Sequence, residues 1–360
     1  MTIMDRRLGR RSVALGLGAG AFGLMSGLPS LARGIAATDD EALLAPVNPE
    51  LRQAARSMLA WRNGPPLSEH YKAIREQTES TFPAPLPGVP VSTQRIAVRG
   101  VASPVTAYVI NAGAGHRPAI LHTHGGGFVL GSAKSEIPAK QAMARDLGCV
   151  IVTVDYSLAP EATYKLSVAQ NYAALRWLYH HASELGVDPR RIAVMGESAG
   201  GGHAALLAIA ARDRGEVPLA FQCLVYPMLD DRTGSSRIPP KPIGELSWDA
   251  PSNRFGWQSF LGQAPGGTTV PVEAVPARTR SLAGLPPAFI GVGSIDLFVD
   301  EDMAYAKRLI DASIATDLHV VPGAFHGFDG AAPDSSVAQQ FTSAKMNALR
   351  RAFAFSRAAS

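Results

Sequence analysis

The sequence predicts an α/β protein with a mostly parallel β-sheet of about eight strands and helices on both faces of the sheet. The first observation is that, from residue 119 onward, short apolar segments alternate with longer segments of helical periodicity. The second is that these short segments are continuously apolar, which is typical of parallel strands buried on both faces. The expected strands are 92–99, 104–111, 119–122, 150–156, 191–196, 221–226, 288–293 and 317–321.

Helices are expected between the strands, at 136–147, 167–185 and 199–214. Gly148 and Gly186 follow the first two, where glycine commonly ends a helix. Residues 37–85 are amphipathic at helical spacing and are expected to form cap helices ahead of a main domain at 86–360. Residues from about 230 to 282 interrupt the alternation and are too long for a simple connection, so we expect an insertion over one face of the sheet.

Residues 1–36 have the order of a secretory signal. A basic stretch precedes a glycine-rich apolar run at 13–28, and small residues follow that run. Arg10-Arg11-Ser12-Val13 resembles the twin-arginine export motif. We therefore expect a twin-arginine-like signal peptide and a periplasmic or secreted mature protein. The alternative is an uncleaved membrane anchor or a lipid-associated N-terminus.

The composition indicates a globular chain, with 46% hydrophobic and 18% charged residues. Residues 1–33 carry five arginines and one aspartate, so the net charge of +4 belongs to the signal and the remainder is close to neutral. We therefore expect no nucleic-acid partner and no stable membrane insertion of the mature protein. Cys149 and Cys223 lie in apolar strands and are expected to be buried thiols, the alternative being a disulfide. The sequence does not indicate the oligomeric state.

Ser198 lies in a Gly-x-Ser-x-Gly pattern, in which Gly196 and Gly200 flank the serine. The pattern falls between an expected strand and an expected helix, the context in which a sharp turn exposes a nucleophilic hydroxyl. Side chains at the two glycines would collide where strand and helix cross. The helix N-terminus directs its dipole and free N–H groups toward the serine. The alternative is a plain glycine-serine turn.

A loop of three glycines follows the strand at 119–122, in the run His124-Gly125-Gly126-Gly127. Glycines leave the backbone N–H groups uncovered, so Gly126 and Gly127, together with Ala199, are expected to form an oxyanion hole. The spacing of His122 and His124 also suggests paired metal ligands, but no further ligand cluster completes such a site, so no metal is expected.

His326 follows the last strand in a loop of small residues and is the expected general base. Asp296, at the end of the preceding strand, is the expected acid that orients it. Asp300, Glu301 and Asp302 compete for that role but fall where a helix should begin, and they are better interpreted as N-terminal helix charges.

Taken together, these residues resemble the hormone-sensitive-lipase-like esterases of the α/β-hydrolase fold. The resemblance covers roughly residues 85–350 and depends on His124-Gly-Gly-Gly, Asp155-Tyr-Ser-Leu-Ala-Pro-Glu161, Gly196-Glu-Ser-Ala-Gly-Gly, Leu285-Pro-Pro, Asp296 and His326-Gly-Phe. It implies a cofactor-free carboxylesterase acting on short- to medium-chain acyl esters under an N-terminal helical cap. Two departures are Glu197, where an aspartate is commoner, and the absence of the usual proline and arginine after Asp296.

The expected function is therefore serine ester hydrolysis of a small-molecule substrate. Alternatives are an acetyl esterase acting on sugars, an amide-cleaving hydrolase, and a non-catalytic ligand-binding relative. Four aromatic side chains are candidates for the substrate pocket: Phe128, Trp248, Phe255 and Trp257. The alternative is that the insertion's aromatic residues form its own core: Trp248, Phe255, Trp257 and Phe260.

Overall fold

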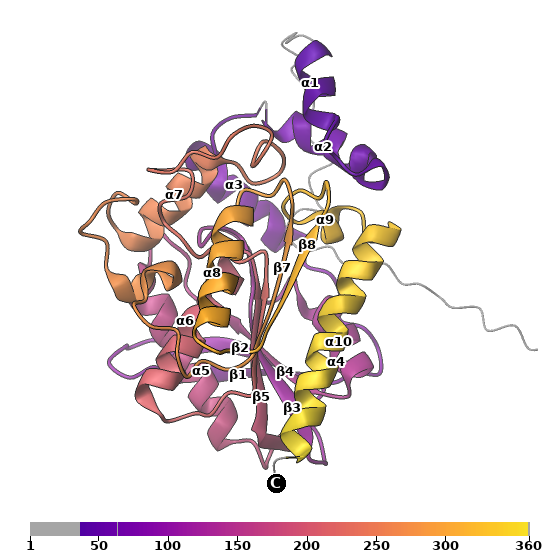
Figure 1. The fold of residues 1–360 in the computed structure, drawn as a ribbon. Coiled ribbons are helices and arrows are strands. Elements are labelled where there is room, and N and C mark those ends of the chain that lie inside the picture. Colours follow the sequence, from indigo (N-terminus) through magenta and orange to yellow (C-terminus); the bar gives the residue numbers. More distant parts are fainter. Residues whose placement is uncertain (1–36, 63, 359–360) are drawn as a thin grey trace, which may run out of the picture.

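Eight strands form one β-sheet in the order β1-β2-β4-β3-β5-β6-β7-β8 (Figure 1). The computed structural model describes residues 37–62 and 64–358. The strands are β1 Val91–Ile96, β2 Val105–Ile110, β3 Arg117–Thr123, β4 Val150–Asp155, β5 Val187–Glu197, β6 Phe221–Val225, β7 Ala288–Gly293 and β8 Thr316–Val321. Strand β2 pairs antiparallel with β1 and with β4, and every other neighbouring pair is parallel. The predicted mostly parallel sheet is confirmed.

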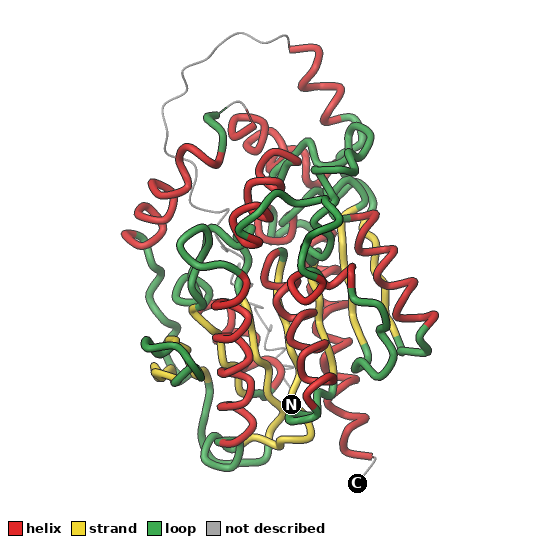
Figure 2. The backbone as a smooth tube through the Cα atoms, turned by 90° about the vertical axis from the view of Figure 1, so that its left-hand side faces the viewer, coloured by secondary structure: helices red, strands yellow, loops and turns green. Residues whose placement is uncertain are grey.

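Both faces of the sheet are buried, which explains the continuously apolar strands. Successive residues of β5 illustrate the alternation: Ile192 and Val194 belong to one core cluster, whereas Ala193 and Met195 belong to the other. The first cluster is covered by α5 (Tyr164–His180), α6 (Ala199–Arg214) and α8 (Val299–Asp311), and the second by α4 (Ile137–Leu147) and α10 (Ser336–Ala358). Figure 1 shows the first set of helices on one side of the strands and the second set on the other, and Figure 2 looks onto the side that carries α5, α6 and α8.

Several helix ends follow from local sequence. Gly148 after α4 and Gly215 after α6 adopt positive φ of 61° and 65°, a left-handed conformation that glycine reaches at little steric cost. Helix α5 ends at His180, five residues before the predicted end, and residues 181–186 form turns. The helical spacing of apolar residues continues into these turns, so the sequence pattern placed the end of the helix too late.

Segments from two distant parts of the sequence cover the upper end of the sheet (Figure 1). Helix α3 (Leu67–Ser80) contacts α7 (Ala250–Leu261), and together they enclose a third apolar cluster. Helices α1 (Ala37–Leu44) and α2 (Arg52–Arg62), with the 3-10 turn η1 (Pro49–Leu51), contribute instead to the cluster beside α10. The remaining short elements are η2 Val272–Ala274, η3 Pro276–Arg278 and α9 Phe328–Ala331.

The predicted export signal at residues 1–36 lies outside the described residues. Within ranges 37–62 and 64–358, no helix has the length and apolar character needed to cross a bilayer. Cys149 and Cys223 are both free and buried, and burial raises the pKa of each thiol to about 12. The two thiols are therefore protonated core groups at neutral pH.

Candidate active site

Ser198 lies at a sharp turn between β5 and α6. Its φ of 58° and ψ of −122° are strained for a residue with a side chain, at a cost on the order of 1–3 kcal/mol. Backbone hydrogen bonds hold the turn, because Ser198 N donates to Val225 O at 2.9 Å and Met228 N donates to Ser198 O at 2.9 Å. The strain is therefore imposed by neighbouring elements, and it projects the hydroxyl beyond the end of the sheet.

Two glycines allow this turn to form. A β-carbon at Gly196 would lie 2.2 Å from Gly200 O, and one at Gly200 would lie 2.0 Å from Thr123 O. Both distances are far below van der Waals contact, so α6 can pack this closely against β3 and β5 only when both side chains are absent. The predicted steric reason for the Gly-x-Ser-x-Gly spacing therefore agrees with the geometry.

The structure brings three distant residues into one hydrogen-bonded chain. His326 Nε2 lies 2.9 Å from Ser198 Oγ, and His326 Nδ1 lies 2.8 Å from Asp296 Oδ2. Asp296 follows β7 and His326 follows β8, so the parallel strands bring both to the same edge of the sheet as Ser198. Relative exposures are 5% for Ser198, 1% for His326 and 0% for Asp296. Phe298 N also donates to Asp296 Oδ1 at 2.9 Å, which fixes the carboxylate.

The glycine loop after β3 lies against the serine. A β-carbon at Gly125 would be 3.0 Å from Glu197 O and 3.5 Å from the Ser198 β-carbon. Gly126 and Gly127 have φ of 116° and 59°. Among the described residues, the N–H groups of Gly126 and Gly127 have no protein acceptor. Two backbone donors in the loop that meets Ser198 at Gly125 therefore remain available for a ligand oxygen.

A buried charged cluster lies beneath the elbow, and sequence analysis did not identify it. Glu197 Oε1 is 2.7 Å from Lys140 Nζ, and Glu197 Oε2 is 2.7 Å from His122 Nε2. His122 Nδ1 lies 2.8 Å from Thr153 Oγ1. Lys140 comes from α4, and nothing in its local sequence marks it, because a lysine inside an amphipathic helix is ordinarily exposed.

Electrostatics favour the ionised forms of Glu197 and Lys140. Burial alone would raise the pKa of Glu197, but the charge of Lys140 and the contact with His122 outweigh burial and hold that pKa well below its usual value. Burial opposes the charge on Lys140, yet Glu197 and Glu136 raise its pKa. Burial, followed by the charge of Lys140, lowers the pKa of His122. The residue before Ser198 is therefore a carboxylate fixed by an ammonium group.

His122 and His124, whose spacing suggested paired metal ligands, bind other protein groups instead. Both ring nitrogens of His122 have protein partners, and His124 Nδ1 lies 2.8 Å from Gly125 O, with its ring stacked on Tyr156. In the part of the chain that the structure describes, no three His, Cys, Asp or Glu residues are grouped so that they could hold a metal ion.

The four candidate pocket residues all belong to the third apolar cluster or pack against it, with different neighbours. Phe128 and Trp257 are fully buried in an aromatic cluster, in which Phe128 stacks on Phe260 at 3.9 Å between centroids. Phe255 is partly buried and its ring lies 5.4 Å from that of Tyr71. Trp248 lies against the glycine loop, since a β-carbon at Gly127 would be 2.1 Å from its ring. Trp248 therefore contacts the candidate oxyanion loop from a distant part of the sequence.

Both parts of the cap are attached to that loop. From α3, Arg75 Nε donates to Val129 O at 2.7 Å. From α7, the backbone at Gly256 approaches so closely that a β-carbon there would lie 2.5 Å from Gly127 O. Trp248 Nε1 donates to Asn253 Oδ1 at 3.1 Å, which fixes the indole in its place. The cap and the glycine loop therefore form one packed unit.

Two further acids lie behind the site in the first turn of α8. The predicted interpretation of Asp300, Glu301 and Asp302 as helix N-terminal charges holds by position, but Glu301 and Asp302 are buried. Glu301 Oε1 accepts from Leu229 N and Asp230 N, whereas neither carboxyl oxygen of Asp302 has a hydrogen-bond partner among the described residues. Burial raises the pKa of Asp302 well above its usual value, and the nearby Glu301 and Asp296 raise it further.

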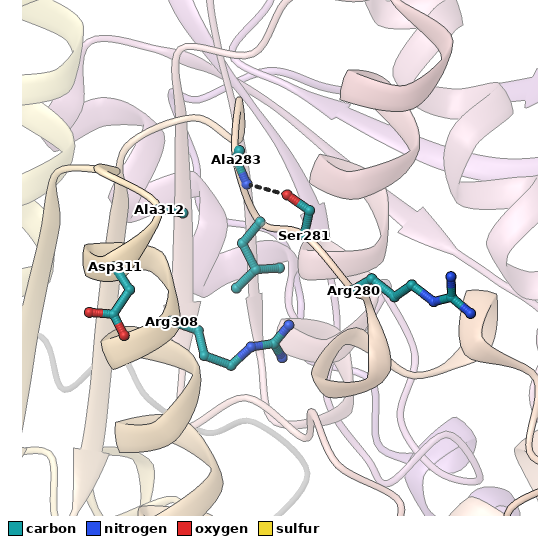
Figure 3. A pocket seen from close by; sticks show the side chains of 7 residues that line it. Arg280, Ser281, Ala283, Arg308, Asp311 and Ala312 are labelled. Carbon is teal, nitrogen blue, oxygen red and sulfur yellow. Dashed lines mark hydrogen bonds between the residues drawn. The ribbon is translucent and has the colours of Figure 1, made fainter.

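A shallow pocket between residues 280–283 and α8 lies elsewhere (Figure 3). Residues 280–283 precede the start of β7, whereas Ser198 follows the end of the parallel strand β5. The pocket therefore lies at the opposite end of the strands from Ser198. The guanidinium of Arg308 already donates to the backbone oxygens of Ala277 and Thr279. The pocket contains none of the predicted site residues.

Comparison with known proteins places this geometry in a family. The sequence profile described as the alpha/beta hydrolase fold matches residues 120–330. Carboxylesterase NlhH of Mycobacterium tuberculosis is 34% identical over 274 residues, which are 76% of this chain and 86% of that protein. Ethyl acetate hydrolase of Pseudomonas putida is 32% identical over 217 residues, 58% of this chain and 65% of the other. A solved structure titled bacterial heroin esterase superposes with a TM-score of 0.78 at 33% identity, covering 86% of this chain and 99% of that one.

The chain therefore belongs to the hormone-sensitive-lipase-like family of α/β-hydrolases. By class it is a carboxylic ester hydrolase, and both the predicted family and the predicted enzyme class are confirmed.

Gly200→Ala tests the steric requirement at the elbow. Because the added methyl group would meet two backbone oxygens of residues 123 and 124, we expect loss of esterase activity and a lower melting temperature, with destabilisation of about 1–3 kcal/mol or more. Gly267→Ala is the matched control, because a β-carbon there meets nothing within 4 Å. Equal melting temperatures and activities for the two variants would contradict the packing argument.

Asp302→Asn tests the buried acid. The pKa of Asp302 is higher in the folded than in the unfolded protein, where it is near 4. The contribution of Asp302 to the free energy of unfolding is therefore complete below about pH 4. It falls by about 1.4 kcal/mol for each pH unit between the two pKa values. The variant should therefore gain stability over the parent, and the gain should grow from pH 5 to pH 8 in denaturant titrations. Asp300→Asn, an exposed change in the same turn, serves as control. A gain independent of pH would show that Asp302 is not protonated in the folded protein.

Proposed function

We propose that this enzyme hydrolyses carboxylic esters in two steps, with Ser198 as nucleophile, His326 as general base and Asp296 as the group that orients the imidazole. The observation that supports the proposal is the buried chain of hydrogen bonds Ser198–His326–Asp296, at 2.9 and 2.8 Å, beside two unpaired glycine N–H groups. These are the distances at which a base can take a proton from a hydroxyl.

In the first step Ser198 Oγ attacks the ester carbonyl while its proton moves to His326 Nε2. Asp296 accepts the hydrogen bond from Nδ1–H and stabilises the imidazolium that forms. The carbonyl oxygen becomes an oxyanion that accepts from the N–H groups of Gly126, Gly127 and Ala199, each donor contributing roughly 3–4 kcal/mol to transition-state stabilisation. The tetrahedral intermediate then collapses, and His326 protonates the departing alcohol.

In the second step water attacks the acyl-enzyme. His326 takes a proton from the water, the same donors bind the new oxyanion, and the carboxylic acid is released as Ser198 recovers its proton. Each proton taken from a nucleophile is returned to a leaving group, so the cycle requires no cofactor.

We further propose that the substrates are short- to medium-chain acyl esters. Trp248 supports this substrate range, because its ring lies against Gly127 and its exposed fraction is 5%, which limits the space next to the oxyanion donors. Among the similar proteins, one is named an ethyl acetate hydrolase. Acetyl esterase activity on sugars and amide cleavage would use the same serine, histidine and oxyanion donors. Only a comparison of substrates therefore distinguishes them from this proposal.

Ser198→Ala tests the nucleophile. We expect kcat for p-nitrophenyl acetate and butyrate to fall by at least about 10³-fold, because the hydroxyl forms the covalent intermediate. Labelling of the protein by a fluorophosphonate should be lost in the same variant. The control is Ser92→Ala, an exposed serine in β1. Wild-type rates in Ser198→Ala would reject the mechanism.

Trp248→Ala tests the acyl pocket. Removing the indole opens space beside Gly127, so the optimum of kcat/KM across a series of p-nitrophenyl esters from two to twelve carbons should shift to longer chains. A substrate panel with acetylated sugars and anilides run in parallel measures the other two activities. Trp177→Ala, on α5 and stacked on His181, is the matched control. An unchanged chain-length profile would show that Trp248 does not line the acyl pocket.

A further inference from the structure

Two aromatic rings contact the imidazole of His326. Tyr226 follows β6, and its ring centroid lies 4.8 Å from that of His326 at an interplanar angle of 65°. Phe298, which precedes α8, lies 5.0 Å away at 90°. Both arrangements are edge-to-face contacts, in which the position of one ring depends on that of the other. The proposed base is therefore packed against side chains from two different elements.

The hydroxyl of Tyr226 extends this contact to the loop that carries the histidine. Tyr226 Oη donates to Asp329 Oδ1 at 2.9 Å. Asp329 lies in α9, three residues after His326, and its Oδ2 is 3.6 Å from Lys345 Nζ of α10. The side chain of Lys345 is only 7% exposed, so this ion pair is shielded from solvent. The His326 loop is thus attached to the end of β6 on one side and to α10 on the other.

Tyr226 is itself fixed in place. Its φ is 35°, an uncommon value for a residue with a side chain, and its N–H donates to Gly291 O at 2.6 Å. Burial raises the pKa of its hydroxyl well above the usual value, and the nearby Asp329 raises it further, so the hydroxyl is neutral and able to donate. The imidazole, in contrast, stands on a short loop next to Gly327, whose φ is 72°. Tyr226 is therefore held by its own backbone hydrogen bond, whereas the loop beside it contains a glycine in the left-handed conformation.

We infer that Tyr226 and Asp329 are positioning residues: the hydrogen bond between them, supported by Lys345, holds the His326 loop so that Nε2 stays within reach of Ser198 Oγ. This inference depends on the proposed role of His326 as general base. Misplacement of a reacting group by about 1 Å can cost on the order of 10²-fold in rate, so loosening the loop should slow catalysis while leaving substrate binding intact.

The first experiment compares Tyr226→Phe with Tyr172→Phe. Each variant loses one hydroxyl that donates to a carboxylate. Tyr172 lies on α5, away from the site, and its Oη donates to Glu216 at 3.1 Å. Tyr226→Phe keeps the ring against the imidazole. We expect its kcat for p-nitrophenyl butyrate to fall about tenfold, with KM changed less than twofold, and the kcat of Tyr172→Phe to stay at the wild-type value.

The second experiment tests the acceptor. Asp329→Asn retains a carbonyl oxygen for the tyrosine hydroxyl and should keep most of the kcat, whereas Asp329→Ala should lose about as much as Tyr226→Phe. Because both single changes break one shared interaction, the double variant Tyr226→Phe/Asp329→Ala should be no slower than either single variant. Active-site titration with a fluorophosphonate normalises each kcat to the concentration of functional sites.

The outcomes separate this inference from the proposed mechanism. Wild-type activity in Ser198→Ala would reject the mechanism itself. If Ser198→Ala is inactive but Tyr226→Phe retains its kcat after normalisation, the mechanism stands and the positioning role is wrong. Fully additive losses in the double variant, or a fall in melting temperature without a fall in normalised kcat, would likewise show that the two residues only stabilise the fold.

Discussion

The close packing of α6 against β3 and β5 is the constraint on which the site depends. Gly196 and Gly200 permit a backbone approach that a methyl group would block, and this approach forces Ser198 into its strained conformation. The same crossing brings the glycine loop after β3 against the serine, because Gly125 lies close to Glu197 O. One steric condition therefore positions both the proposed nucleophile and the proposed oxyanion donors.

Electrostatic interactions support this packing from two sides. Beneath the elbow, Lys140 and His122 hold the Glu197 carboxylate, so a charge buried next to the nucleophile has partners for both oxygens. Behind the imidazole, Asp296 has a backbone donor in addition to His326, whereas the neighbouring Asp302 has no partner and its pKa is raised. One acid therefore has hydrogen-bond partners for both oxygens, whereas burial without a partner raises the pKa of the other.

Helices α3 and α7, which lie above the sheet, both contact the same glycine loop. Arg75 of α3 bonds to Val129 O, and α7 approaches Gly127 through Gly256 and Trp248. Family membership settles the fold and the ester-hydrolase class, but a fold alone does not fix the substrate. In the proposed function, Trp248 beside Gly127 is the side chain expected to limit the length of the acyl group.

The sequence by itself determined the sheet, the elbow at Ser198 and the candidates Asp296 and His326, because periodicity, glycine spacing and strand ends are local patterns. It also predicted an aromatic insertion, but it could not show that Trp248 packs with Trp257 in one apolar cluster and also lies against Gly127. Only the tertiary structure decided the burial of Lys140 beside Glu197 and the contact of Tyr226 with His326 and Asp329. Those contacts join side chains from different elements, and their partners are fixed by how helices and strands pack, which no local pattern records.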